Sequence, residues 1–557
     1  MSNRRRGLPI TSSRIEQIFP KLTAAQVGRI QPHGRIRTIQ RGDLLIEQGD
    51  NSVPFFVVIK GELEILRPFG TNETLVTVHT TGQFTGEVNT LSGRRSLFRV
   101  RVTKSGKVIE LNHQQMLGLV QTDAELGDIL MRAFILRRVE LISAGVGDIV
   151  LIGSTNSAGT LRIKEFLMRN GHPYSYIDLE QDPDVQNFMD GFKVSTGEIP
   201  VLICRGQLVL RNPSNEEIVK CLGFNELIDQ SHVRDLVIVG AGPSGLAAAV
   251  YGASEGLDIL VLETSSPGGQ AGSSSRIENY LGFPTGISGQ ELAARAYLQA
   301  QKFGAHILIT QARGLICDRK PYVIEIDNGT KIFTRTILIA TGAQYRKLSL
   351  ENLSRFEGAG IYYGATYVEA QLCGGEEVIV VGGGNAAGQA AVFLSGFTKG
   401  VHILIRSAGL VNTMSRYLVR RIEETAAIVL HPYTEIVALE GAKHLENVIW
   451  HNNQKDQTEK NKIRHVFVMT GADPNTRWLS GCVSLDSEGF IKTGLDLSPK
   501  DLSDLRRPVN RPPYLLETSV PGVFAVGDVR SGNIKRVASA VGEGSIAISF
   551  IHKVLQE

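Results

Sequence analysis

Residues 235–263 limit the possible folds of this chain more than any other stretch. An apolar run leads into a glycine turn, an Ala-rich run of helical character follows, and a second apolar run ends on Glu263. This order of strand, G-x-G-x-x-G turn, helix, strand and acid is typical of a dinucleotide-binding unit. We therefore expect a pyrophosphate at the helix N-terminus and a ribose hydroxyl on Glu263. The turn of this first fingerprint consists of Gly240, Ala241, Gly242, Pro243, Ser244 and Gly245.

Residues 377–406 form a second fingerprint of the same kind, in which an alanine takes the third glycine position, as the pattern allows. Its second apolar run ends on Arg406 rather than on an acid. A cation there suits a 2′-phosphate, so we expect NADPH in preference to NADH; the alternative is a solvated surface charge. Two dinucleotide sites in one chain predict FAD together with a nicotinamide, and hence a redox enzyme. The turn residues are Gly382, Gly384, Asn385 and Ala387.

Charge and hydropathy exclude two classes of partner. The 557 residues include 59 Lys and Arg against 56 Asp and Glu, a net charge of +3 that is too balanced to indicate nucleic-acid binding. No apolar run approaches the roughly 20 residues that a membrane span needs, and the N-terminus has no apolar signal region. We expect a cytoplasmic protein of several domains with no membrane partner.

No two cysteines of the chain are spaced as C-x-x-C. Their number and scatter indicate neither a disulfide framework nor a zinc site, so we expect reduced, mostly buried thiols and no metal. The five are Cys204, Cys221, Cys317, Cys373 and Cys482.

Residues 10–145 are predicted to form a small β-roll. Short apolar strands are expected at 44–46, 55–59, 63–65 and 75–78, with a turn at Lys60-Gly61. Helices are expected near 24–30 and 114–144.

This unit resembles a cyclic-nucleotide-binding domain, in its glycines Gly42, Gly49 and Gly61 and in Phe84-Thr-Gly86-Glu87. The resemblance implies that Glu87 faces a ribose and that an arginine further along binds the cyclic phosphate. Ser96 stands at the arginine position, and Arg94 and Arg95 come just before it. We therefore expect weak or no binding of cyclic nucleotide, with Arg95 as the phosphate ligand if the loop is shorter. A roll used for docking or dimerisation is the alternative.

Residues 148–227 are predicted to form a β-α-β unit followed by a hairpin and a helix. They resemble a thioredoxin or glutaredoxin domain, with Pro200 in the place of that family's cis-proline. The family's C-x-x-C is replaced by Ser157-Ala-Gly-Thr160. Because a hydroxyl cannot act as a leaving thiolate, we expect this unit to be redox-inert and to serve packing or partner docking.

Residues 233–557 resemble the thioredoxin-reductase branch of the two-dinucleotide flavoproteins. The resemblance implies two Rossmann-like α/β domains: an FAD domain split into 233–348 and 473–557, and an NAD(P)H domain at 349–472. It also places Asp528 on the FAD ribityl chain and the amides after it at the flavin. Beyond the fingerprints it rests on Gly268-Gly269-Gln270, Glu278-Asn279, Thr341-Gly342, Thr470 to Pro474, Gly527-Asp528 and Arg536-Val537-Ala538.

The chain departs from this branch just before the second fingerprint. Disulfide reductases of the branch carry Tyr-Cys-x-x-Cys there, whereas this chain has Gly364 and Tyr367 at the two cysteine positions. Cys373 is expected to be a buried apolar thiol. The resemblance then implies a homodimeric NAD(P)H-dependent FAD oxidoreductase that reduces an external carrier such as ferredoxin, flavodoxin or a thioredoxin-like protein. The alternatives are a thioredoxin-disulfide reductase and a non-enzymatic redox or cyclic-nucleotide sensor.

Overall fold

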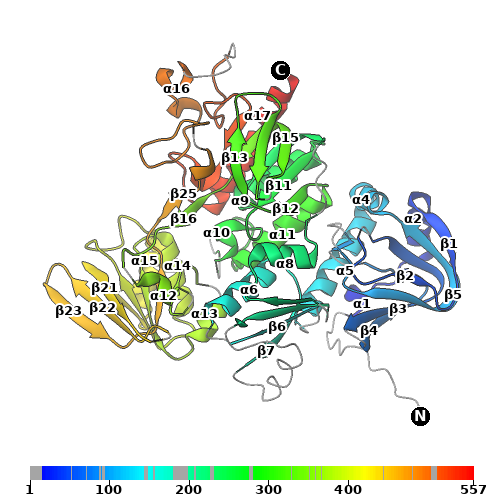
Figure 1. The fold of residues 1–557 in the computed structure, drawn as a ribbon, viewed down its shortest axis with the longest axis horizontal. Helices are drawn as coiled ribbons and strands as arrows, with labels where there is room; N and C mark the ends of the chain where they lie inside the picture. Colours follow the sequence, from blue (N-terminus) through cyan, green and yellow to red (C-terminus); the bar gives the residue numbers. More distant parts are fainter. Residues whose placement is uncertain are drawn as a thin grey trace. The chain divides into compact units, whose positions relative to one another are not determined.

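The chain divides into two compact units, each described here by itself (Figure 1). The first comprises Met1–Thr155, Ile163–Asp229 and Leu298–Thr310, and the second comprises Asn156–Arg162, Gln230–Tyr297 and Gln311–Glu557. The computed structural model describes residues 15–557 except 52, 70–71, 87–88, 91–94, 144–147, 155–156, 180–197, 206–207, 226–230, 275–276, 278–279, 328, 351, 358, 366, 443, 480 and 504–510. Among the described helices, none is long and apolar enough to cross a membrane.

The first unit begins with a five-stranded roll whose order is β1-β5-β3-β4, with β2 paired to β5. Thr23 and Asn112 begin helices α2 and α4 with complete capping boxes, which satisfy the first amides of each helix. Asp123 ends α4 and accepts a hydrogen bond from the Leu126 amide, so the helical region expected near 114–144 consists of two helices. The elements are α1 (Ile15–Ile18), α2 (Ala24–Ile30), η1 (Gln31–His33), β1 (Arg35–Ile39), β2 (Leu44–Ile46), β3 (Phe55–Phe69), β4 (Asn72–His79), β5 (Arg99–Leu111), α4 (His113–Thr122) and α5 (Ala124–Ser143).

The turn expected at Lys60-Gly61 is wrong. β3 runs through this point without a break, and only its pairing register with β5 shifts there. Gly61 has a φ of +107°, and a Cβ on it would lie 2.5 Å from the Lys104 carbonyl oxygen. The glycine therefore serves a β-bulge that accommodates an extra residue, rather than a chain reversal.

The first unit also contains a four-stranded sheet of order β7-β6-β8-β9. β7 is parallel to β6, whereas β8 and β9 are antiparallel to their neighbours, which is the predicted β-α-β and hairpin arrangement. The Ile199-Pro200 peptide bond is cis, as expected for Pro200. The elements are β6 (Ile149–Gly153), α6 (Ala158–Arg169), β7 (Ser175–Asp178), β8 (Val201–Cys204), β9 (Leu208–Arg211) and α8 (Asn215–Leu222). The first unit also includes β12 (His306–Ile309), which is not a strand of this sheet.

The expectation of five reduced thiols is wrong for four of the cysteines. Cys204 at the end of β8 is bonded to Cys221 in α8, and Cys317 is bonded to Cys482. Cys373 is free and buried, as expected. The second pair is 165 residues apart in sequence, so its spacing carried no signal, and only the fold brings the two Cα atoms to 6.0 Å.

The second unit is built on a mixed sheet that the C-terminal part of the chain completes (Figure 1). β10 lies between β11 and β15 in parallel, β14 and β13 continue the sheet antiparallel, and β26 pairs in parallel with β15. The elements are β10 (Val233–Val239), α9 (Pro243–Ser254), β11 (Ile259–Glu263), α10 (Gly269–Gly272), α11 (Gly289–Lys302), β13 (Ala312–Ile316), β14 (Tyr322–Ile326), β15 (Lys331–Ile339), η3 (Arg477–Leu479), η4 (Gly494–Asp496), α16 (Pro499–Ser503), β26 (Val523–Ala525), η5 (Gly527–Val529) and α17 (Val537–Gln556).

Between β15 and β26 the chain builds a separate parallel sheet of order β17-β24-β18-β19-β20 and a three-stranded antiparallel sheet of order β21-β22-β23. β16 and β25 pair antiparallel where the chain leaves and returns, next to the predicted boundaries at 348 and 472. The elements are β16 (Ala343–Tyr345), α12 (Leu353–Phe356), β17 (Ile361–Tyr362), α13 (Tyr367–Leu372), β18 (Glu377–Val381), α14 (Asn385–Leu394), β19 (Gly400–Leu404), α15 (Arg416–Glu424), β20 (Ile428–His431), β21 (Thr434–Glu440), β22 (Asn447–Asn452), β23 (Gln457–Asn461), β24 (His465–Val468) and β25 (Ala472–Pro474).

The crossing of α17 over α9 should depend on one glycine. A Cβ on Gly544 would lie 2.2 Å from the Ser244 carbonyl oxygen, whereas a Cβ on Gly542 in the same helix would meet nothing within 4 Å. We expect Gly544→Ala to lower the free energy of unfolding by about 1–3 kcal/mol. Gly542→Ala should change it by less than about 1 kcal/mol, on the stabilising side. Urea unfolding followed by circular dichroism measures both, and equal effects would contradict the packing argument.

Candidate functional site

The first fingerprint forms a tight turn that leaves an open helix end. Gly240 has a φ of +109°, and a Cβ on it would lie 2.3 Å from the Ala340 carbonyl oxygen. A Cβ on Gly245 would lie 1.9 Å from the Gly240 carbonyl oxygen, so the third glycine lets α9 pack against its own turn. Gly242 is the N-cap of α9, and only the Gly269 Cα approaches its missing Cβ, at 3.9 Å. This geometry fits a pyrophosphate at the α9 amides.

The carboxylate of Glu263 holds this turn in place. It is buried, and it accepts hydrogen bonds from the Ala241 amide at 2.8 Å and from the Ser265 amide at 3.0 Å. The acid at the end of β11 therefore positions the glycine turn as well as standing where a ribose hydroxyl is predicted.

Gly269 and Gln270 lie at the start of α10, beside the same turn. The Gly268 amide donates to the Ala241 carbonyl at 2.7 Å, and the Gln270 side chain donates to the Ala343 carbonyl. The motif around 268–270 thus links the first fingerprint to β16. Asn279, which belongs to the same predicted set, lies outside the described residues.

Thr341 and Gly342 are fastened to the returning chain by one asparagine. The Thr341 hydroxyl donates to the Asn475 carbonyl at 2.9 Å, and the Asn475 side-chain amide donates to the Thr341 carbonyl at 2.8 Å. Sequence reasoning missed Asn475, although it directly follows the motif that ends at Pro474.

The C-terminal motif packs against the beginning of α9. A Cβ on Gly527 would lie 2.6 Å from the Ser244 hydroxyl oxygen. The Gly527 amide donates to Glu543 at 2.7 Å, and Arg530 and Asn533 bind the other oxygen of that carboxylate at 2.6 and 2.9 Å. Glu543 was not predicted either, because its role depends on Gly527, Arg530 and Asn533, which the fold places beside α17.

Asp528 and the start of α17 form the remaining part of this region. Burial raises the pKa of the Asp528 carboxyl, and Glu543 adds to this shift whereas Lys535 opposes it. Arg536 is the N-cap of α17 and makes no side-chain capping bond, so the first amides of the helix, from Val537 and Ala538, are not capped by it. A polar group of FAD can accept from them.

The second fingerprint repeats the geometry of the first. A Cβ on Gly382 would lie 2.2 Å from the Met469 carbonyl oxygen, whereas Gly384, the N-cap of α14, has open space on its Cβ side. Ala387 is fully buried. Asn385 accepts a hydrogen bond from the Ser415 amide at 2.8 Å, which ties the turn to the start of α15. The arrangement fits the pyrophosphate of a second dinucleotide.

Arg406 follows β19 at the surface. In the described part of the chain it takes part in no ion pair. Arg416 and Arg420 in α15 are exposed as well, and Arg420 lies 3.9 Å from Glu424. Guanidinium groups of this kind suit a 2′-phosphate, so the residues present fit NADPH.

The positions of the expected redox cysteines hold no thiol. A Cβ on Gly364 would lie 3.6 Å from the Ser273 Cβ, just after α10, in ordinary contact. Tyr367 begins α13, but its side chain and Thr366 lie outside the described residues. Cys373 is fully buried in the apolar core against the parallel sheet, and burial raises the pKa of its thiol.

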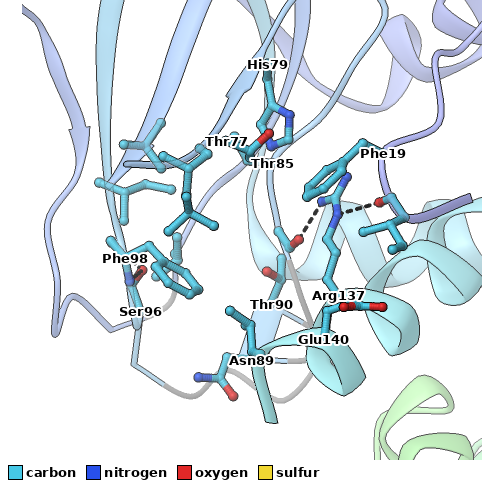
Figure 2. A pocket seen from close by; sticks show the side chains of 18 of the residues that line it. Phe19, Thr77, His79, Thr85, Asn89, Thr90, Ser96, Phe98, Arg137 and Glu140 are labelled. Atoms are coloured by element: carbon cyan, nitrogen blue, oxygen red, sulfur yellow. Dashed lines mark hydrogen bonds between the residues drawn. The ribbon is translucent and has the colours of Figure 1, made fainter. Parts of the chain in front are cut away.

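The roll contains a cavity of about 100 Å³, shown in Figure 2. Ser96 does not present a free hydroxyl to it, because that hydroxyl donates to the Phe98 carbonyl at 2.7 Å. Arg95 donates instead to Asn51 at 3.1 Å and does not line the cavity. Glu87 and Arg94 lie outside the described residues. Among the residues described, Arg137 is the one arginine or lysine that lines the cavity.

Residues 234–544, more than half of the chain, match the family described as "Pyridine nucleotide-disulphide oxidoreductase". The chain belongs to this family. Residues 36–123 match the cyclic nucleotide-binding domain. The oxidoreductase is 31% identical over 317 residues to the thioredoxin reductase of Mycoplasma genitalium, which covers 57% of this chain and 93% of that protein. It is 29% identical over 330 residues to the thioredoxin reductase of Bacillus subtilis, covering 59% and 97%.

Solved structures agree with this assignment. Thioredoxin reductase from Lactococcus lactis superposes with a TM-score of 0.52 at 27% identity, and that from T. acidophilum with 0.51 at 29%. Each covers 58% of this chain and 99% of the solved one. The oxidoreductase is therefore a multidomain, thioredoxin reductase-like enzyme that uses FAD and NADPH and carries an N-terminal cyclic nucleotide-binding domain.

Replacement of Arg406 by alanine should weaken the binding of NADPH more than that of NADH. A charge-assisted hydrogen bond contributes about 1.5–3 kcal/mol, so KM for NADPH should rise roughly tenfold or more while KM for NADH changes little. Lys455→Ala, at an exposed turn of the same domain, is the matched control. Steady-state kinetics with both nucleotides measure the change, and equal increases for NADPH and NADH would show that Arg406 does not contact the phosphate.

Replacement of Asp528 by asparagine should have opposite effects on stability and on FAD binding. Because burial raises the folded-state pKa, the folded protein binds the proton more tightly, and stability falls as pH rises from about 3.8 through the folded pKa. Asp528→Asn should therefore raise the free energy of unfolding of the flavin-free protein more at pH 7.5 than at pH 4.5. It should also weaken the binding of FAD about tenfold if the carboxylate contacts FAD. Urea unfolding at both pH values and FAD titration measure these effects. Asp456→Asn, at a side chain that is 97% exposed, should alter neither.

Proposed function

We propose that this oxidoreductase transfers electrons from NADPH through FAD to an external carrier protein, such as a ferredoxin or flavodoxin, without a dithiol of its own. When bound, NADPH and FAD supply the redox chemistry. The residues of the chain bind the two dinucleotides and hold the nicotinamide domain and the FAD domain together.

The observation that carries this proposal is the glycine at position 364. A dithiol relay needs one thiolate beside the flavin and a second thiol to close the disulfide. Gly364 has no side chain, and the phenol of Tyr367 cannot form a disulfide at any pH. A Cβ on Gly364 would make an ordinary contact with Ser273, just after α10. A side chain therefore has room at position 364, and the glycine is not required by packing.

The remaining cysteines do not replace the missing pair. Four of the five cysteines are in disulfides. In the Cys317–Cys482 disulfide, Cys317 directly follows β13, the outer strand of the sheet, which lies two strands away from β15. Cys373 is fully buried and its thiol pKa is raised, so thiolate is scarce at neutral pH.

The unit at 148–227 supports the same conclusion. Thr160, at the second position of its expected redox motif, is fully buried, and a hydroxyl cannot enter thiol–disulfide exchange. We propose that this thioredoxin-like unit serves the docking of the carrier or the packing of the chain.

The test is a comparison of acceptors. NADPH-reduced protein should reduce a ferredoxin or flavodoxin, whereas turnover of thioredoxin and of a small aromatic disulfide should stay well below one per second, the lower end of ordinary enzymes. Gly364→Ala, whose added methyl has room, should leave carrier reduction unchanged.

Two outcomes would contradict the proposal. Thioredoxin turnover of about one per second or faster that survives Cys373→Ala would show a disulfide reductase that works without the expected relay. Thioredoxin turnover that disappears in Cys373→Ala would assign the role to that thiol.

A further inference from the structure

The roll cavity is bounded by strands on one side and by α5 on the other (Figure 2). Its wall is mainly apolar, with Ile65, Val76, Phe98 and Val100 contributed by the strands and the segment before β5. Figure 2 shows His79 and Thr77 on the strand side, and Arg137 and Glu140 on the helix side. The cavity lies wholly within the first unit.

The arginine of the cavity is already engaged by the protein. The Arg137 Nε donates to the Ile18 carbonyl at 2.9 Å, and one Nη donates to the Gly86 carbonyl at 2.6 Å. The guanidinium also lies over the rings of Phe84 and Phe19, at 4.7 and 5.2 Å from their centres. These contacts fix the position of the guanidinium, and Glu140, which also lines the cavity, would repel a phosphate.

His79 places a buried nitrogen in the wall of the cavity. His79 is 2% exposed, and its Nδ1 has no hydrogen-bond partner among the described residues. Burial and the nearby Arg137 lower the imidazole pKa well below its usual value, so the ring is neutral at physiological pH. A buried nitrogen without a partner is costly to the folded protein unless a ligand or water satisfies it.

We propose that the roll cavity binds a small, uncharged, mainly apolar molecule that makes one hydrogen bond to His79 Nδ1, in place of a cyclic nucleotide. The apolar wall supplies the affinity by burial, and the imidazole selects for a ligand with one polar group. The carboxylate of Glu140 in the same wall selects against an anion.

The test is isothermal titration of the full-length protein with three probes. Indole is apolar and has one N–H, indene has the same shape without it, and cyclic AMP is the charged alternative. We expect indole to bind, indene to bind about tenfold more weakly through loss of the hydrogen bond, and cyclic AMP not to compete with indole. Absence of indole binding, or micromolar binding of cyclic AMP, would overturn the proposal.

Two variants locate the bound probe. Val76→Phe fills the cavity and should abolish indole binding, and His79→Leu should make indole and indene bind alike. Lys107→Ala, exposed on β5 and outside the cavity, should bind indole as the unmodified protein does. Circular dichroism and FAD content establish that each variant is folded. Indole binding that persists unchanged in Val76→Phe would place the probe elsewhere and refute the assignment.

Discussion

The structure of the second unit depends on close backbone approaches at the beginning of α9. A Cβ on Gly245, Gly527 or Gly544 would lie within 2.6 Å of an atom of Gly240 or Ser244. Two segments from the C-terminal part of the chain, at η5 and in α17, therefore pack on one helical turn that is distant from them in sequence, and glycine permits the close approaches. The same convergence leaves the first amides of α9 open at Gly242, so the packing that closes the domain also creates the dinucleotide site.

We propose that around this scaffold the chemistry of the chain differs from that of a dithiol-dependent reductase. The cofactor-binding turns are intact, whereas the residue at 364 is a glycine beside Ser273 and the free thiol is sealed in a core. In the roll, the strands and α5 enclose a cavity whose described wall is mainly apolar, with the unpartnered His79 Nδ1 in it. The fold alone therefore does not settle what either place binds or reduces, because function resides in sites rather than in folds.

Several groups that organise the site are held by contacts between distant elements. Asn475 joins Thr341 across the crossing between the two dinucleotide domains, and Glu543 collects Gly527, Arg530 and Asn533. Glu263 likewise accepts hydrogen bonds from the Ala241 amide in the glycine turn and from the Ser265 amide after β11. Each carboxylate or amide satisfies backbone donors that would otherwise be buried without partners, so each is a positioning group for the residues that the motifs name.

The sequence by itself determined the two fingerprints, the strands of the roll and the absence of cysteine at 364 and 367, because these depend on local periodicity and residue chemistry. The split FAD domain stays a prediction of the sequence. It was wrong about Gly61, since the same glycine serves a turn or a bulge, and about four cysteines. Only the tertiary structure decided the Cys317–Cys482 pair, the roles of Asn475 and Glu543, and the isolation of His79 in the roll cavity. These depend on which segments meet in space, and no pattern along the chain records such meetings.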